Sequence, residues 1–208
     1  MKSLTRVLIL VLVLGLTITT DKVFAASISK DQAAAMDPKM EAMMAKFKEY
    51  STPNENHKAL DTLVGSWDYT LNWWMSPDKA PETSTGTSEI GWILNNHFIK
   101  QTVSGTSMGQ PFEGLGLIGY NNIKKTYETI WLDNMATGMM MGKSQFDADK
   151  KVLSEKGDFT CPLVDGNRGY RTMTTLQDAD HFTYEMYMND VETGKEFKSM
   201  EIHYTKKK

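Results

Sequence analysis

Few residues of this chain have the types and spacing that chemistry requires. Gly105-Thr106-Ser107-Met108-Gly109 matches G-x-S-x-G, the nucleophile elbow of hydrolases. That motif works where a strand-to-helix turn exposes the serine beside an oxyanion hole. Gln110-Pro111-Phe112 cannot start such a helix, and no carboxylate spacing singles out His181 or His203 as a base. We interpret the segment as a hairpin loop and expect no enzymatic activity, with a hydrolase built on Ser107 as a minor alternative.

Metal ligands are equally sparse. The histidines do not form an H-x-H or H-x-x-x-H pair of the kind that binds zinc, so we expect neither a metal site nor a cofactor. The chain has 15 methionines, and thioether ligands suit Cu(I). Methionine more often fills irregular gaps in a core, so copper binding is a minor alternative. The two methionine clusters are Met36, Met40, Met43 and Met44, and Met135, Met139, Met140 and Met141.

Aromatic residues give the best candidate site. Small-molecule pockets combine apolar and aromatic walls with a few polar groups. Asp133 shares its parity with Trp131, so it either orients a polar head group or caps the adjacent turn at Asn134, and we favour capping. The predicted ligand-binding residues are Trp73, Tyr127, Trp131, Asp133 and Tyr184.

Alternating strands must position these side chains. From Trp67 to Met75, apolar and polar residues alternate, which is typical of a half-buried β-strand. Similar stretches recur almost to Tyr204, separated by turns such as Asn95-Asn96. No long helical pattern interrupts them, so we predict one mainly-β domain, an antiparallel barrel. The predicted strands are 66–75, 84–94, 97–104, 112–120, 126–133, 139–147, 152–161, 168–176, 181–188 and 195–205.

Glycines inside the predicted strands bear on the barrel's volume. Glycine is unfavourable within a strand unless a bend or a close approach requires it. These residues indicate either barrel curvature or room for a ligand, and the two explanations are compatible. They are Gly114, Gly116, Gly119, Gly138 and Gly142.

A helical segment precedes the strands. Asp37 and Pro38 are typical of a helix start, and the following methionines and Phe47 fall on one helical face. Thr52 and Glu55 fit a capping box for a second short helix.

The first 25 residues read as a secretory signal peptide. Lys2 and Arg6 precede an apolar run, which ends near Ala25. We therefore predict a signal peptide over 1–25, a leader and amphipathic helix over 26–50, and a barrel domain over 51–208. The mature protein is expected to be exported, periplasmic or secreted, without stable membrane insertion.

The charge balance excludes one class of partner. The chain has 23 Lys and Arg against 26 Asp and Glu, a formal net charge of −3. Nucleic-acid binding needs clustered basic residues, so no nucleic-acid partner is expected. Cys161 is the sole cysteine, so no internal disulfide can form.

Several motifs together resemble the bacterial DUF1579 family of unknown function. They are Gly65-Ser66-Trp67, Gln110-Pro111-Phe112-Glu113-Gly114, Gly119-Tyr120-Asn121, Trp131-Leu132-Asp133-Asn134-Met135 and Thr137-Gly138. This resemblance implies a lipocalin-like antiparallel barrel of about ten strands with a short N-terminal helical segment, and no established activity. His203 is similar in position to the proximal histidine of heme-binding barrels, but its parity, opposite to Ile202 and Tyr204, predicts the outer face. Heme binding is thus a minor alternative.

The sequence therefore predicts an exported barrel that binds a small apolar or amphipathic molecule. The main alternative is an interaction module in which the Met-rich helix docks on a partner protein or a surface. The oligomeric state, the identity of the ligand and the open end of the barrel stay undetermined at this point.

Overall fold

The structure is a computed structural model that describes residues 37–208. The predicted signal peptide and residues 26–36 of the predicted leader segment lie outside the described residues. Within residues 37–208, no helix is long and apolar enough to cross a membrane.

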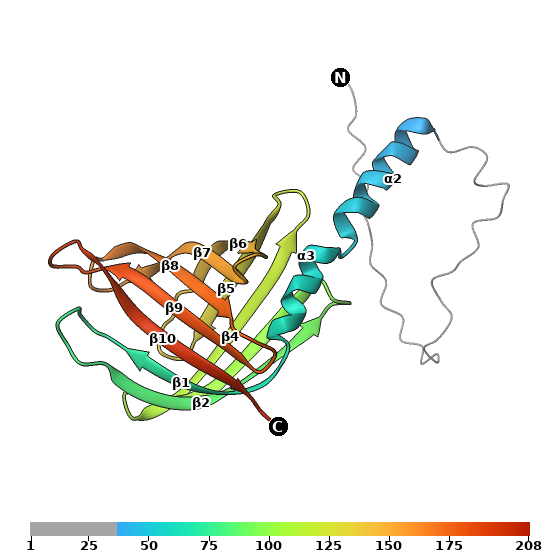
Figure 1. Cartoon of the computed structure of the whole chain (residues 1–208). Helices are drawn as coiled ribbons and strands as arrows, with labels where there is room; N and C mark the ends of the chain where they lie inside the picture. The colour runs from blue at the N-terminus through green and yellow to red at the C-terminus, as the bar shows by residue number, and fades with distance from the viewer. Residues whose placement is uncertain (1–36) are drawn as a thin grey trace, which may run out of the picture. The chain divides into compact units, whose positions relative to one another are not determined.

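Ten strands form a closed barrel, as the alternation predicted (Figure 1). Each strand pairs antiparallel with its neighbours in the chain, and β1 closes the barrel by pairing with β10. The strands are β1 (Gly65–Trp73), β2 (Glu82–Ile93), β3 (Phe98–Ser107), β4 (Gln110–Asn121), β5 (Thr126–Asp133), β6 (Met140–Asp147), β7 (Val152–Cys161), β8 (Gly166–Leu176), β9 (His181–Asn189) and β10 (Glu196–Lys206).

Tight turns join the strands. Asn95 and Asn96 have positive φ angles of 56° and 62°, which asparagine tolerates well. Between β3 and β4, Met108 and Gly109 have φ angles of 48° and 73°, as in a two-residue hairpin turn of the primed type. Ser107 pairs with Gln110 across this turn. The G-x-S-x-G segment is therefore a β-hairpin, and it has no strand-to-helix elbow.

Helical turns precede the barrel. These elements are α2 (Pro38–Ser51), α3 (Glu55–Lys58) and the 3₁₀ helix η1 (Ala59–Leu63). The prediction of a cap at Thr52 was wrong. Asn54 is the N-cap of α3, and it forms a capping box with His57. Asn54 directly precedes Glu55, the first residue of α3, whereas Thr52 lies two residues earlier and donates its hydroxyl to the carbonyl of Lys48 at 2.6 Å.

Trp67 closes one end of the barrel together with η1. Its side chain is fully buried, and its Nε1 donates to the carbonyl of Leu63 at 2.9 Å. The Phe182 ring packs edge-on against it at 4.7 Å. Leu60 and Leu63 of η1 belong to the same buried cluster. This is the closed end of the barrel.

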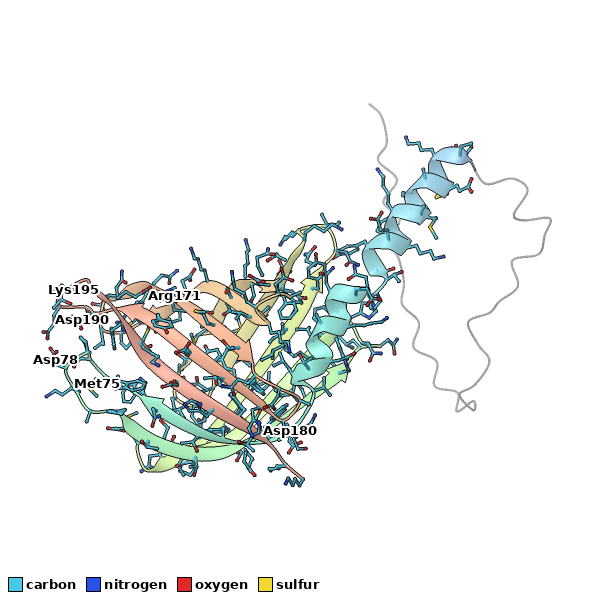
Figure 2. The ribbon with its side chains drawn as sticks, in the orientation of Figure 1. Met75, Asp78, Arg171, Asp180, Asp190 and Lys195 are labelled. Atoms are coloured by element: carbon cyan, nitrogen blue, oxygen red, sulfur yellow. The ribbon has the colours of Figure 1, made fainter. Side chains whose placement is uncertain are left out.

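The loops at the other end carry exposed apolar side chains. We call this end the mouth; Figure 2 shows Met75, Asp78, Asp190 and Lys195 there, with Asp180 at the closed end. All five loops at the mouth contain at least one large exposed apolar residue. These residues are Met75, Met108, Met135, Met139, Leu163, Val164 and Val191.

The packing of Trp67 makes the first prediction. Replacing Trp67 with alanine should lower the free energy of unfolding by about 3–5 kcal/mol, because it leaves a cavity and an unpaired carbonyl at the closed end. Urea denaturation measures this loss. His203→Ala, on the exposed outer face, is the control and should change stability by less than about 0.5 kcal/mol. A similar small loss for Trp67→Ala would contradict the role of Trp67 as the plug.

The capping box makes the second prediction. His57 Nδ1 accepts the backbone N–H of Asn54 at 3.0 Å. Burial, and to a lesser degree the nearby His97, lower the pKa of His57 below its usual 6.5. Between the folded and unfolded pKa values the unfolded chain binds more protons. The free energy of unfolding should therefore fall as the pH is lowered from about 7 to about 5.

His57→Gln is the matched variant for this pH effect. Glutamine keeps an acceptor at the capping-box position but does not titrate. Urea denaturation of both proteins over this pH range should show a weaker pH dependence for the variant. Equal slopes would assign the pH dependence to other groups.

Candidate functional site

The candidate site is a chamber inside the barrel, between the closed end and the middle of the strands. Its volume is about 80 Å³. One part of its wall is aliphatic or aromatic: Leu63, Ile90, Ile99, Ile118, Leu153 and Phe182. The other part bears polar atoms: Gln101, Glu155, Thr172, Thr174, Tyr184 and Tyr204. Since ligand pockets usually enclose about 300–1,000 Å³, the chamber suits a small group.

A carboxylate lies in this wall with two hydroxyl donors. Tyr170 donates its hydroxyl to Glu155 Oε1 at 2.8 Å, and Ser144 donates to Oε2 at 3.0 Å. Adjacent strands supply the three side chains, because β7 pairs with β6 on one side and with β8 on the other. We call Ser144, Glu155 and Tyr170 the Glu155 cluster.

Two glycines make the space for this cluster. A Cβ at Gly142 would overlap the Glu155 carboxylate, and a Cβ at Gly157 would overlap the Tyr170 phenol. Both glycines lie within strands, where glycine is usually unfavourable. Their presence follows from the room that the cluster needs.

The phenols of the interior are hydrogen-bond donors that resist ionisation. Burial raises the pKa of Tyr170, Tyr184 and Tyr204 well above the usual value of 10.0. The negative charge of Glu155 raises the pKa of Tyr170 and Tyr184 further. Gln101 Nε2 donates to Ser88 Oγ at 2.9 Å on the other side of the interior. The chamber thus keeps uncharged polar groups around one carboxylate.

The predicted ligand-binding residues lie at different levels of the barrel. Tyr184 lines the chamber. Tyr127 is buried, and its hydroxyl donates to the carbonyl of Asn56 at 2.8 Å, which ties β5 to the helical segment. Burial raises the pKa of Tyr127 to about 12, so the hydroxyl keeps its proton.

The other three predicted residues lie nearer the mouth. Trp131 donates Nε1 to Asp133 Oδ2 at 2.9 Å, and Asp133 Oδ1 accepts the N–H of Met135 at 3.0 Å. Asp133 therefore caps the adjacent turn, the role that the sequence favoured. Trp73, at the end of β1, is half-buried. The five residues share no single wall.

Ring packing fills the space that the other inward glycines leave. The Trp131 ring lies over Gly114 and Gly116, where a Cβ at Gly114 would overlap it. The Tyr69 hydroxyl occupies the space at Gly86 and Gly105 in the same way. The predicted room is therefore largely taken by the protein's own side chains, and the chamber is what remains.

Sequence reasoning missed Gln101, Glu155 and Thr172. A signal for Glu155 was present, because it shares the parity of Leu153 and Gly157 on a predicted strand. That parity places a carboxylate inside the barrel. His203 is exposed on the outer face, as its parity predicted.

A larger hollow lies on the outer face of β2 to β5. It measures about 630 Å³, and its wall includes Glu89, Glu113, Leu115 and Leu132. These side chains point away from the barrel interior and face water. Its carboxylates, Glu89 and Glu113, are exposed, so the hollow is a weaker candidate than the enclosed chamber.

Gly114 gives a test of the ring packing. Gly114→Val should lower the free energy of unfolding by about 1–3 kcal/mol, because the new side chain displaces the Trp131 ring. Tryptophan fluorescence and urea denaturation measure the shift. Gly91→Val is the control, since nothing lies within 4 Å of a Cβ there. Unchanged stability and fluorescence in Gly114→Val would contradict this packing.

Comparison with solved structures supports the fold. A crystal structure of Rv2717c from M. tuberculosis matches with a TM-score of 0.54 and 14% identity, covering 76% of this chain and 100% of that one. A redesigned β-barrel matches with a TM-score of 0.38 and 16% identity, covering 72% of this chain and 96% of that one. At these identities the first match shows a shared fold alone, and the second carries no argument.

Comparison by sequence identifies the family. No curated protein matches the chain. A family model described as "Protein of unknown function (DUF1579)" matches residues 52–206, which span the capped helical segment and all ten strands. The resemblance seen in the sequence motifs is thereby confirmed, and the chain belongs to the DUF1579 family.

Proposed function

We propose that this protein binds a small amphipathic molecule in the chamber of its barrel. The observation that carries the proposal is the polar part of the chamber wall. Gln101, Glu155 and Thr172 point into an interior that aliphatic side chains could have filled. Burying polar groups costs free energy. Apolar side chains at these positions would stabilise the barrel more, so the polar ones favour a role in binding.

The chamber's volume limits the ligand. At about 80 Å³ it accepts a head group of a few heavy atoms. A longer tail would extend toward the mouth, where Met140 and Met188 point inward from β6 and β9. Their register supports this direction, because they pair with the inward-facing Trp131 and Tyr170. Unbranched methionine side chains adapt readily to a guest.

Trp67 and η1 block the closed end, so we propose entry from the mouth. Every loop there exposes an apolar side chain, which favours contact with an amphipathic molecule before entry. The predicted signal peptide of residues 1–25 would place this site outside the cytoplasm. Binding without catalysis is the activity we propose.

Filling the chamber tests this function. Thr174 lines the chamber, so Thr174→Phe should abolish binding of short n-alkanols from butanol to octanol. Thr175→Phe is the matched control, because the neighbouring residue points to the outer face. Titration calorimetry should detect binding to the wild type and to Thr175→Phe, and an affinity at least about tenfold lower for Thr174→Phe.

Native mass spectrometry of protein purified from its host supplies a second readout. A small molecule should copurify with the wild type and with Thr175→Phe, and it should be absent from Thr174→Phe. Full retention of alkanol binding by Thr174→Phe would place the ligand elsewhere. Absence of binding in the wild type would refute the proposal.

A second candidate function rests on α2. This helix of 14 residues has no buried residue, and its apolar side includes Met43 and Phe47. Protein contact through α2 would cover these side chains, and a second copy of the chain is the first partner to test. Sedimentation equilibrium should then show an oligomer that Phe47→Glu converts to a monomer; a monomeric wild type would exclude self-association.

A further inference from the structure

We propose that the head group of the ligand is a small ammonium ion, and that the carboxylate of Glu155 binds it. This inference rests on the proposed function, because it names the chemical class that the same chamber would accept. Three features of the chamber favour a cation: the missing counter-charge, the free acceptor positions and the character of the surrounding groups.

The first feature is charge. Several carboxylates on the outer face of the barrel have cationic partners, as in Glu196 with Arg171 at 2.7 Å and Glu185 with Lys198 at 3.0 Å. Within residues 37–208, Glu155 forms no ion pair. Glu155 is half-buried. A carboxylate that is partly withdrawn from water without a counter-charge carries a desolvation cost, which a bound cation would offset.

Neighbouring cations of the protein are directed elsewhere. Lys143 and Lys156 lie on the same strands as the Glu155 cluster but are exposed on the outer face. Arg168, at an inward position of β8, lies at the mouth and donates to the carbonyl of Asn189. The counter-charge must therefore come from a ligand.

The second feature is the number of hydrogen-bond acceptor positions on Glu155. An ionised carboxylate offers about four lone-pair positions. Ser144 and Tyr170 occupy one position on each oxygen of Glu155. Glu155 also forms part of the chamber wall, so positions remain for donors that enter the chamber. An ammonium group has three N–H donors and is small enough for this space.

The third feature is the character of the groups that surround Glu155. Tyr170 and Ser144 hold the carboxylate in place as neutral donors, and neither neutralises it. Tyr184 and Phe182, which also line the chamber, present aromatic rings. A cation near such rings gains further stabilisation. An anionic head group would meet the Glu155 charge, which opposes its binding.

Three molecules of similar size test the inference: n-butylammonium, n-butanol and butyrate. Titration calorimetry at neutral pH should show that the wild type binds n-butylammonium at least about tenfold more tightly than either other molecule. Glu155→Gln keeps the shape of the side chain and removes its charge. This variant should lose the preference and still bind n-butanol with unchanged affinity.

Glu113→Gln is the control for long-range attraction. Glu113 is an exposed carboxylate on the outer face of β4, and its replacement should leave all three affinities unchanged. The comparison of the three molecules in the wild type needs no variant, so it decides the question even if Glu155→Gln folds poorly.

The outcomes separate the two proposals. Equal binding of n-butanol and n-butylammonium would overturn the ammonium preference and leave the binding function intact. A preference that persists in a folded Glu155→Gln protein would also overturn the role of Glu155. Failure of all three molecules to bind would overturn both proposals together.

Discussion

The pairing of β1 with β10 is the constraint on which the rest of this structure depends. It joins the two ends of the strand series, from Trp67 opposite Lys206 to Trp73 opposite Met200. Closure removes the free edges of the sheet, and it separates an inner face from an outer face on every strand. Each further property of the molecule follows from what is placed on those two faces.

Closure limits the volume that is available to side chains on the inner face. Large rings such as Trp131 and Tyr69 fit only because glycines on neighbouring strands leave room beside them. Trp67 and η1 close one end. The chamber lies between this end and the middle of the strands, in a layer whose wall includes the polar side chains of Gln101, Glu155 and Thr172. In this barrel, polarity and empty space occur together.

Charged side chains also have different surroundings on the two faces of the barrel. Outside, ion pairs such as Arg171 with Glu196 are partly hydrated, and each contributes little to stability. The Arg171 guanidinium also lies over the Tyr187 ring, 3.7 Å from its centroid, in a cation–π contact. Inside, Glu155 relies on two hydroxyls supplied by adjacent strands. Its position is consequently as fixed as the register of β6, β7 and β8.

The contacts of the helical segment show a similar dependence on register. Asn122, in the turn between β4 and β5, accepts from Asn54 Nδ2 at 2.7 Å and donates to the carbonyl of Thr52 at 2.9 Å. These bonds attach the segment that leads into α3 to a hairpin distant in sequence. Asn54 Nδ2 bonds to Asn122, while Oδ1 of Asn54 accepts the N–H of Asn56 as the cap of α3.

The sequence by itself determined the ten strands, the outward position of His203 and the capping role of Asp133. These features depend on side-chain alternation and on residues next to one another in the chain, so local reasoning reaches them. Tertiary structure decided the volume of the chamber and the partners of Glu155. The donors to Glu155 come from residues 144 and 170, on two other strands, and only the pairing register brings them together. The volume of the chamber depends on how the rings from many strands pack in one interior, and this packing cannot be predicted from any local sequence pattern.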